Sequence, residues 1–289
     1  MKMKWYLVLM VFLSSCQQNL SVWDSQLEKH KQLISDKSCR LIIAQHKAYR
    51  DGYLPKIADD CIKKIEIQEL PGEDLVDINA QNHPRIKMLP NPKSPFASPD
   101  CNSGFLEASK IRKTLYKKLE RLLAELDAIA DEFGFDPGYI SIMVFEGLRS
   151  ITTQKKLFND KIEEIQKANP SFTYAQSVAE ASKWVSPVQN NVPAHSTGGA
   201  VDIRLYDEQR KQFVDMGMFG VIWDANTSAP TFSDNINEQQ IKNRLFLLIA
   251  ASKACLINYP YEFWHFSTGD RYAAYWLNPE GRAIYGGIS

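Results

Sequence analysis

Residues 195–202 read His195-Ser-Thr-Gly-Gly-Ala-Val-Asp202, and this stretch decides how the chain must fold around it. Its two glycines loosen the turn after His195, so the backbone can fold back on itself. Residues 200–205 alternate between apolar and polar side chains, which predicts a half-buried strand with Asp202 projecting from one face. The stretch therefore predicts an imidazole and a carboxylate held close together at the start of a strand.

A second motif further along the chain, Glu262-Phe-Trp-His265, supplies another carboxylate and another imidazole. Residues 261–266 are rich in aromatic side chains and predict a short strand. Residues three apart on a flat strand face opposite ways, so we expect a bulge or a strand end near Trp264 to bring Glu262 and His265 together. Three ligands, an open position for water and a nearby base are what a catalytic zinc site requires. The two motifs together predict a metal-dependent hydrolase.

The same donor set would also accept cobalt or nickel, so the metal itself stays open. Taken alone, a histidine is more often structural than a ligand, and an Asp beside glycines often only anchors a turn. Two motifs that complete one site make that explanation much weaker. The chain has five histidines, and the other three, His30, His46 and His83, have no such company. We interpret these three as surface residues.

The pattern H-x-x-x-x-x-x-D followed by E-x-W-H resembles the zinc D-alanyl-D-alanine dipeptidases, within the wider group of D,D-carboxypeptidase-like metallopeptidases. The run Trp-His-Phe-Ser-Thr-Gly-Asp-Arg-Tyr at residues 264–272 extends the resemblance, which covers the chain from about Leu75 to the C-terminus. The resemblance implies that Glu262 is the general base. The ligands that it implies for one zinc ion per chain are His195, Asp202 and His265.

Two further site residues follow from the resemblance. The family has an arginine at a strand end that polarises the scissile carbonyl. The matching segment here is Phe145-Glu-Gly-Leu-Arg149-Ser, at the end of a strand-like run over residues 139–145. A fixed cation aimed at developing negative charge is a large catalytic contribution. The segment Gly220-Val-Ile-Trp223-Asp224 fits the family pattern in which an Asp binds the free amine of the substrate.

The chain departs from the family in two places. Pro193 stands where the family usually has Ser, two residues before the first histidine, and Ser150 stands where it usually has Pro, after the arginine. We expect these departures to affect how the substrate is held, because neither touches the metal ligands or the base.

The implied activity is hydrolysis of D-Ala-D-Ala, or a similar small D,D-dipeptide from cell-wall metabolism, by metal-activated water. A D,D- or L,D-carboxypeptidase or endopeptidase for longer peptidoglycan stems stays open. Asp224 separates the two, since only a dipeptidase must recognise an amine close to the scissile bond. A third hypothesis is a non-catalytic zinc-bearing lipoprotein that binds peptidoglycan. Glu262 and Arg149 argue against it, because binding alone requires neither.

The N-terminus resembles a bacterial lipoprotein signal. A short basic region at residues 1–4 precedes an apolar stretch, residues 5–13, that is shorter than the roughly 20 residues of a spanning helix. The following Leu-Ser-Ser-Cys16 resembles a lipobox, in which Cys16 is lipidated and anchors the protein to a membrane. Gln17 is not the Asp typical of inner-membrane retention, so we expect export to the periplasmic face of the outer membrane. An ordinary cleaved signal with an incidental cysteine is the alternative.

The cysteine count agrees with export. Apart from Cys16, four cysteines remain, an even number that suits an oxidising compartment. Of the three possible sets of pairs we favour Cys39 with Cys61 and Cys101 with Cys255. None has C-x-x-C spacing, so we do not expect them to bind zinc.

Composition sets the domain organisation. The chain has 289 residues, of which 44% are hydrophobic, and its formal net charge is zero. Neutral charge without a basic cluster argues against a nucleic-acid partner. We expect a signal peptide at residues 1–15, an N-terminal helical or linker segment at 16–70 and the catalytic domain at 71–289. The oligomeric state stays open.

Periodicity outlines the elements. Apolar residues from Ile111 to Phe133 mark one helical face, with Ser109 as the N-terminal cap and Gly134 as the stop. Prolines predict a long loop over residues 84–99. Further helices are expected over residues 152–168, 174–185 and 237–256, the last a buried one. Together these elements predict an α+β fold, in which helices flank an antiparallel central sheet that carries the zinc site.

Overall fold

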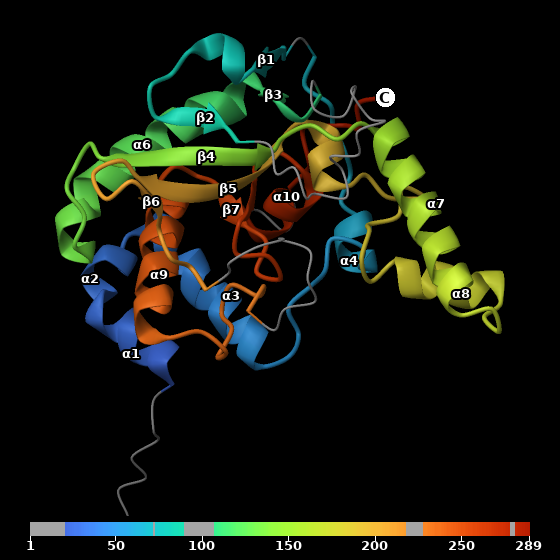
Figure 1. The fold of residues 1–289 in the computed structure, drawn as a ribbon, viewed down its shortest axis with the longest axis horizontal. Helices are drawn as coiled ribbons and strands as arrows, with labels where there is room; N and C mark the ends of the chain where they lie inside the picture. Colours follow the sequence, from blue (N-terminus) through green and yellow to red (C-terminus); the bar gives the residue numbers. More distant parts are fainter. Residues whose placement is uncertain (1–20, 72, 90–106, 218–227, 278–280) are drawn as a thin grey trace, which may run out of the picture.

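A computed structural model describes residues 21–71, 73–89, 107–217, 228–277 and 281–289. A six-stranded sheet lies at its centre, with the order β2-β4-β5-β8-β7 and with β6 paired to β5 (Figure 1). The strands are β2 (Ile86–Met88), β4 (Ile140–Glu146), β5 (Ala200–Asp207), β6 (Gln212–Phe213), β7 (Ile257–Asn258) and β8 (His265–Ser267). The pairings are antiparallel except for β2 with β4, which is parallel. The predicted α+β class is confirmed, with one parallel pair in a mainly antiparallel sheet.

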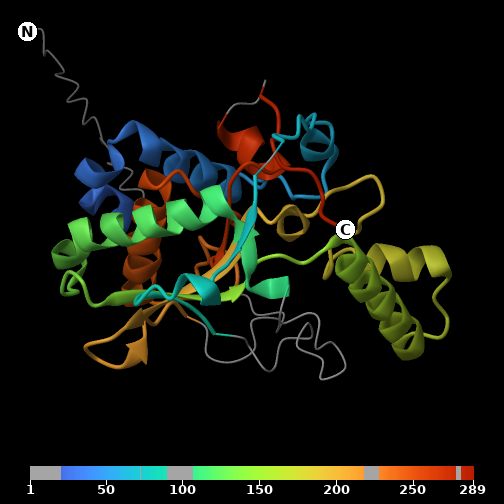
Figure 2. The same cartoon turned by 90° about the horizontal axis from the view of Figure 1, so that it is seen from above.

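Two long helices form the core with this sheet. The first, α6 (Lys113–Phe133), buries its apolar stripe against β4 and against the second, α9 (Glu238–Lys253). Figure 2 shows both on the same side of the sheet as the N-terminal helices. A capping box between Asn237 and Gln240 starts α9. The prediction of a buried helix is confirmed, although it ends before residue 256. None of the helices in the described part of the chain has the length and apolar content that a membrane crossing requires.

The predicted start of α6 was wrong. Lys110–Arg112 forms a short strand, β3, that pairs with β1 (Leu75–Asp77), so the backbone is still extended at Ile111. The helix begins at Lys113, and Ser109 is not its cap. Tertiary pairing with a distant strand overrides the helical periodicity here. The predicted stop is confirmed, since Gly134 ends the helix with a left-handed φ of 83°.

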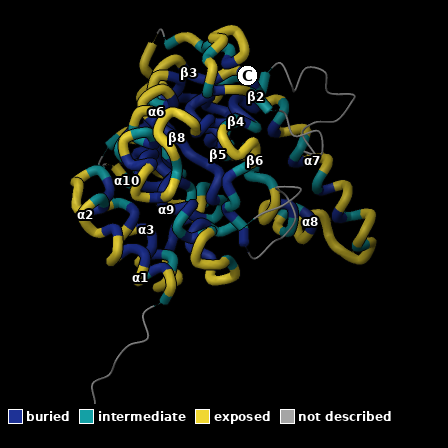
Figure 3. Tube along the Cα trace, turned by 60° about the vertical axis from the view of Figure 1, so that its left-hand side comes forward, coloured by how far each residue is buried: buried dark blue, intermediate teal, exposed yellow. Residues whose placement is uncertain are grey.

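The N-terminal segment consists of α1 (Val22–Lys29), α2 (Lys31–Ile34), a 3₁₀ turn η1 (Lys37–Cys39), α3 (Arg40–Arg50) and α4 (Asp60–Lys63). Its helices α1 to α3 share the main core, whereas Ile62 of α4 belongs to a smaller cluster with Ile257 and Tyr272. Trp23, which is only 1% exposed, packs edge-on against Phe232 and donates to the Ser233 carbonyl. Figure 3 shows buried positions gathered in the sheet and on the helix faces turned toward it.

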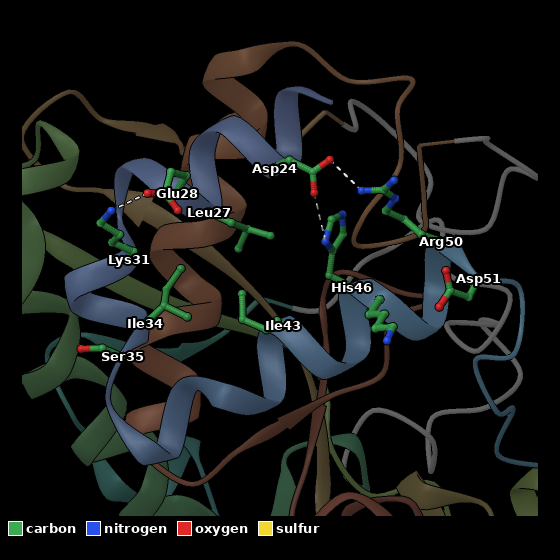
Figure 4. Close-up of a pocket in the computed structure, with 11 residues that line it drawn as sticks. Asp24, Leu27, Glu28, Lys31, Ile34, Ser35, Ile43, His46, Arg50 and Asp51 are labelled. Carbon is green, nitrogen blue, oxygen red and sulfur yellow. Dashed lines mark hydrogen bonds and ion pairs between the residues drawn. The ribbon is translucent and has the colours of Figure 1, made fainter. Parts of the chain in front are cut away.

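The interpretation of three histidines as surface residues was wrong for two of them. His30 is buried, donates from Nδ1 to the Gln26 carbonyl at 2.9 Å, and stacks on Phe133. His46 is also buried, and in Figure 4 it points toward Asp24. Both are buried because the N-terminal helices pack onto the body, which composition alone does not reveal. His83 is half-buried.

The helices α7 (Ile151–Ala168) and α8 (Tyr174–Ala181) form a hairpin that projects from the body (Figures 1 and 2). It has a small core of its own: Phe158, Ile162, Ile165 and Ala181. The second helix is shorter than the predicted span of 174–185. The predicted loop over 84–99 contains strand β2, and residues 90–99 lie outside the described part of the chain.

The predicted disulfide between Cys39 and Cys61 was wrong, because both are free thiols. Cys39 is buried and its Sγ lies 3.8 Å from the Ile249 carbonyl, whereas Cys61 is exposed on α4. The two residues therefore sit in different environments on different elements. Cys255 is an exposed free thiol, and its predicted partner Cys101 lies outside the described residues.

Candidate metal centre and peptidase site

The first motif folds back as its glycines predict. His195 lies in a 3₁₀ turn, η3 (Ala194–Thr197), which Gly198 ends with a left-handed φ of 68°. Gly199 must be a glycine, because an added Cβ would lie 2.5 Å from the Thr268 carbonyl oxygen. Strand β5 then starts at Ala200, and Asp202 is its third residue. Its carboxylate Oδ1 lies 3.2 Å from His195 Nε2.

The second motif reaches the same point from the neighbouring strand. Asp202 and His265 are direct partners in the pairing of β5 with β8, and Asp202 Oδ1 lies 3.0 Å from His265 Nδ1. Strand β8 starts only at His265, which confirms the expected strand end near Trp264. The predicted strand over 261–266 was wrong for residues 261–264, which form turns closed by backbone hydrogen bonds from Glu262 to Tyr259 and from His265 to Glu262.

These three side chains fit a tetrahedral metal ion. All are buried, and their donor atoms lie within 4.8 Å of one another. Two ligands of a tetrahedral zinc, each about 2.0 Å from the metal, lie roughly 3.3 Å apart, close to the contacts seen here. Burial raises the pKa of Asp202, but His195 and His265 lower it more, so its net pKa is well below the ordinary value. Asp202 is therefore an anion between two imidazoles, as a ligand set requires.

The carboxylate of Glu262 stands beside this cluster. Its Oε2 lies 4.0 Å from His265 Nδ1, and the side chain retains 30% exposure. Burial raises the pKa of Glu262, His265 opposes the shift, and the net pKa is raised. A carboxyl with a raised pKa in a cleft has the properties of a general base.

Arg149 lies just after the end of β4, where the sequence predicted it. Its Nε donates to Glu146 Oε1 at 2.6 Å, and its Nη1 donates to Gln154 Oε1 at 2.9 Å. The side chain is only 9% exposed, so both contacts fix the guanidinium firmly. Burial lowers the pKa of Arg149, but the carboxylate of Glu146, helped by Asp202 and Glu262, raises it more, so the net pKa is raised.

The sequence comparisons agree with this geometry. The profile of a protein family described as D-ala-D-ala dipeptidase matches residues 123–278, more than half of the chain. The chain belongs to this peptidase family. A D-alanyl-D-alanine dipeptidase from Synechocystis sp. is 27% identical over an alignment of 241 positions, and the match covers 74% of this chain and 89% of the relative. The family match includes the three clustered side chains, Glu262 and Arg149, whereas residues 21–122 lie outside it.

The peptidase cleft is open to solvent and measures about 510 Å³. The residues that line it include His195, His265, Glu262 and Arg149. The segment after α8, residues around Tyr259 and part of the N-terminal segment also line the cleft. Two predicted functional residues, Asp224 and Cys16, lie outside the described residues.

Several supporting groups in this peptidase site were not predicted. The Gly147 carbonyl lies 2.8 Å from His195 Nδ1, which leaves Nε2 for a metal. Asn258 Nδ2 donates to the carbonyls of Glu262 at 3.3 Å and His265 at 3.0 Å. Glu146 has a sequence signal, an acid three residues before an arginine at a strand end. The backbone carbonyl and Asn258 have none, because their roles depend on tertiary neighbours.

Proposed function

We propose that the protein is a zinc dipeptidase that hydrolyses D-Ala-D-Ala or a similar small D,D-dipeptide. The observation that carries the proposal is the convergence of His195, Asp202 and His265, with Glu262 beside them in a cleft. The family membership and the name of the Synechocystis relative support the substrate class.

In this proposal His195 Nε2, Asp202 Oδ1 and His265 Nδ1 hold the zinc ion. When bound, zinc would act as a Lewis acid and lower the pKa of water to about 7. Glu262 accepts the proton of the attacking water and then delivers it to the nitrogen of the leaving amino acid. The raised pKa of Glu262 suits both transfers, because the proton must be accepted and then released.

Arg149 stabilises the negative charge that develops on the carbonyl oxygen. Its guanidinium is already oriented by Glu146 and Gln154, so little reorganisation accompanies the reaction. Asp224 would bind the free amine of the substrate. The protein would act at the periplasmic face of the bacterial outer membrane, anchored by lipid on Cys16, in recycling or trimming of cell-wall peptides.

The test is release of D-alanine from D-Ala-D-Ala by residues 17–289, with and without a chelator. Glu262→Gln keeps the size of the side chain and removes the base, so kcat should fall by about 10²- to 10⁴-fold. Glu163→Gln, an exposed glutamate on α7, is the matched control and should behave like the wild type.

Two results would redirect the proposal. A zinc-loaded protein that releases no D-alanine from D-Ala-D-Ala, but shortens longer peptidoglycan stems, would be a carboxypeptidase or endopeptidase. A Glu262→Gln variant equal to the wild type on every substrate would favour a zinc-bearing binding protein.

A further inference from the structure

One wall of the cleft comes from outside the family match. Lys56, Ile57 and Ala58 line the cleft, yet they precede residue 123, where the match begins. This wall is fixed to the catalytic side of the molecule, because the Tyr261 hydroxyl donates to the Leu54 carbonyl at 2.9 Å. Residues 54–58 are therefore held beside the turn that carries Glu262.

A second set of contacts secures the continuation of this segment. Ile62 on α4 is fully buried and packs against Ile257 and Tyr272, which flank β8 in the sequence. Arg271 Nε donates to the Ile65 carbonyl at 2.9 Å. The chain is therefore held to the body both before Lys56, at Leu54, and after it, at Ile62 and Ile65.

The cationic side chains that line the cleft differ in whether a carboxylate pairs with them. Arg149 is paired with Glu146, and Lys183 Nζ lies 2.6 Å from Glu180 Oε2. Lys56 Nζ lies 5.5 Å from the centre of the Tyr261 ring, and no carboxylate of the described residues lies within ion-pair distance of it. The nearby Asp59 accepts from the backbone N–H of Lys56, not from its ammonium.

The ring of Tyr261 also orders the lysine side chain. A cation over an aromatic face is attracted to it, which lowers the entropy lost when the ammonium binds an anion. Lys56 and Tyr261 both line the cleft, and Tyr261 directly precedes Glu262 in the sequence. A cation there attracts a carboxylate and repels the ammonium end of a peptide.

We propose that Lys56 binds the terminal carboxylate of the peptide substrate and so sets which end of the peptide enters this side of the cleft. The proposal rests on the proposed function, since it names a subsite of the same cleft. A free carboxylate lies one residue beyond the bond that a dipeptidase breaks, so substrates with a terminal carboxylate are favoured over those that continue past it.

Binding without turnover tests this subsite. In the zinc-loaded Glu262→Gln background, affinity for D-Ala-D-Ala and for its C-terminal amide is measured by calorimetry. Lys56→Met keeps the length of the side chain and removes its charge, and Lys56→Arg keeps the charge. Lys64→Met is the control, because Lys64 is an exposed lysine of the same segment that does not line the cleft.

We expect Lys56→Met to weaken binding of D-Ala-D-Ala about 10-fold and to leave binding of the amide unchanged, since only the acid offers an anion. Lys56→Arg should retain most of the affinity, and Lys64→Met all of it. Equal losses for the acid and the amide, or no loss for either, would overturn the subsite.

Catalytic activity separates this outcome from the proposed function. If the wild type hydrolyses D-Ala-D-Ala and Lys56→Met binds both the acid and the amide normally, the Lys56 subsite is refuted and the dipeptidase proposal stands. Charge-dependent binding at Lys56 without any hydrolysis refutes the dipeptidase proposal and keeps the subsite. Absence of both binding and hydrolysis refutes both.

Discussion

At the scale of single residues, Asp202 is the side chain on which the site depends. It is 1% exposed and contacts both imidazoles with one oxygen. A buried anion without compensating charge is costly, so a bound cation would stabilise this arrangement. The three side chains therefore belong together electrostatically as well as geometrically.

Asp202→Asn tests this dependence. The amide has the same shape but no charge, so we expect zinc affinity to fall at least about 100-fold. Competition with a chromogenic chelator measures the affinity. Asp160→Asn, an exposed position on α7, is the control. Stoichiometric zinc with unchanged affinity in Asp202→Asn would contradict the ligand assignment.

At the scale of elements, one ion pair ties α6 to the edge of the sheet. Arg85 contacts both carboxylate oxygens of Asp127, at 2.9 Å and 2.7 Å, and also donates to the Ile140 carbonyl. The Gly138 N–H donates to the same carboxylate at 2.9 Å. Burial raises the pKa of Asp127, but these hydrogen bonds lower it more, so the net pKa is below its ordinary value.

A lowered pKa in the folded state means that the ionised form stabilises the fold. The contribution is complete above the unfolded pKa of about 3.9 and is lost as the pH falls through the lower, folded pKa. Asp127→Asn should therefore lower the free energy of unfolding by about 1–2 kcal/mol near neutral pH.

Urea unfolding at a series of pH values measures this difference. The gap between the wild type and Asp127→Asn should persist down to the unfolded pKa of about 3.9 and close as the pH falls further, through the lower pKa of the folded state. Asp131→Asn, on the exposed side of the same helix, should show no such gap. If the difference in the free energy of unfolding did not depend on pH, packing and not the charge of Asp127 would account for the stabilisation.

At the scale of the whole molecule, the N-terminal helices and the peptidase site share one core. Residues from α1, α2 and α3 belong to the same buried cluster as those of β4, β5 and α9. The division of the chain at residue 70 therefore does not correspond to separate cores in the structure. The N-terminal segment also supplies a wall of the cleft.

Trp23→Ala should therefore destabilise the whole protein, by about 3–5 kcal/mol, because a large buried aromatic side chain is removed. Thermal unfolding followed by far-UV and near-UV circular dichroism should shift in parallel at both wavelengths. Trp184→Ala is the control, since Trp184 is 45% exposed and should change stability little. If Trp23→Ala shifted only a small, early unfolding transition and left the main transition unchanged, the N-terminal segment would be an independent folding unit.

The local features of this protein follow from its amino-acid sequence. Strand β5, the turn that returns His195 to Asp202 and the stop at Gly134 follow from short-range patterns of glycine, alternation and periodicity. The strand end beside Trp264 could also be predicted, since Glu262 and His265 converge only if the strand does not continue through them. These features depend on a few neighbouring residues, whose conformational preferences the sequence contains directly.

The features that join distant segments arise from tertiary packing. The strand at Lys110–Arg112, the burial of His46 and the place of Lys56 in the cleft arise from partners far away in the chain. Asn258 beside the turn of Glu262 is a further example. Burial and pairing energies are set by which surfaces meet, and a residue's own type and its near neighbours do not fix that choice.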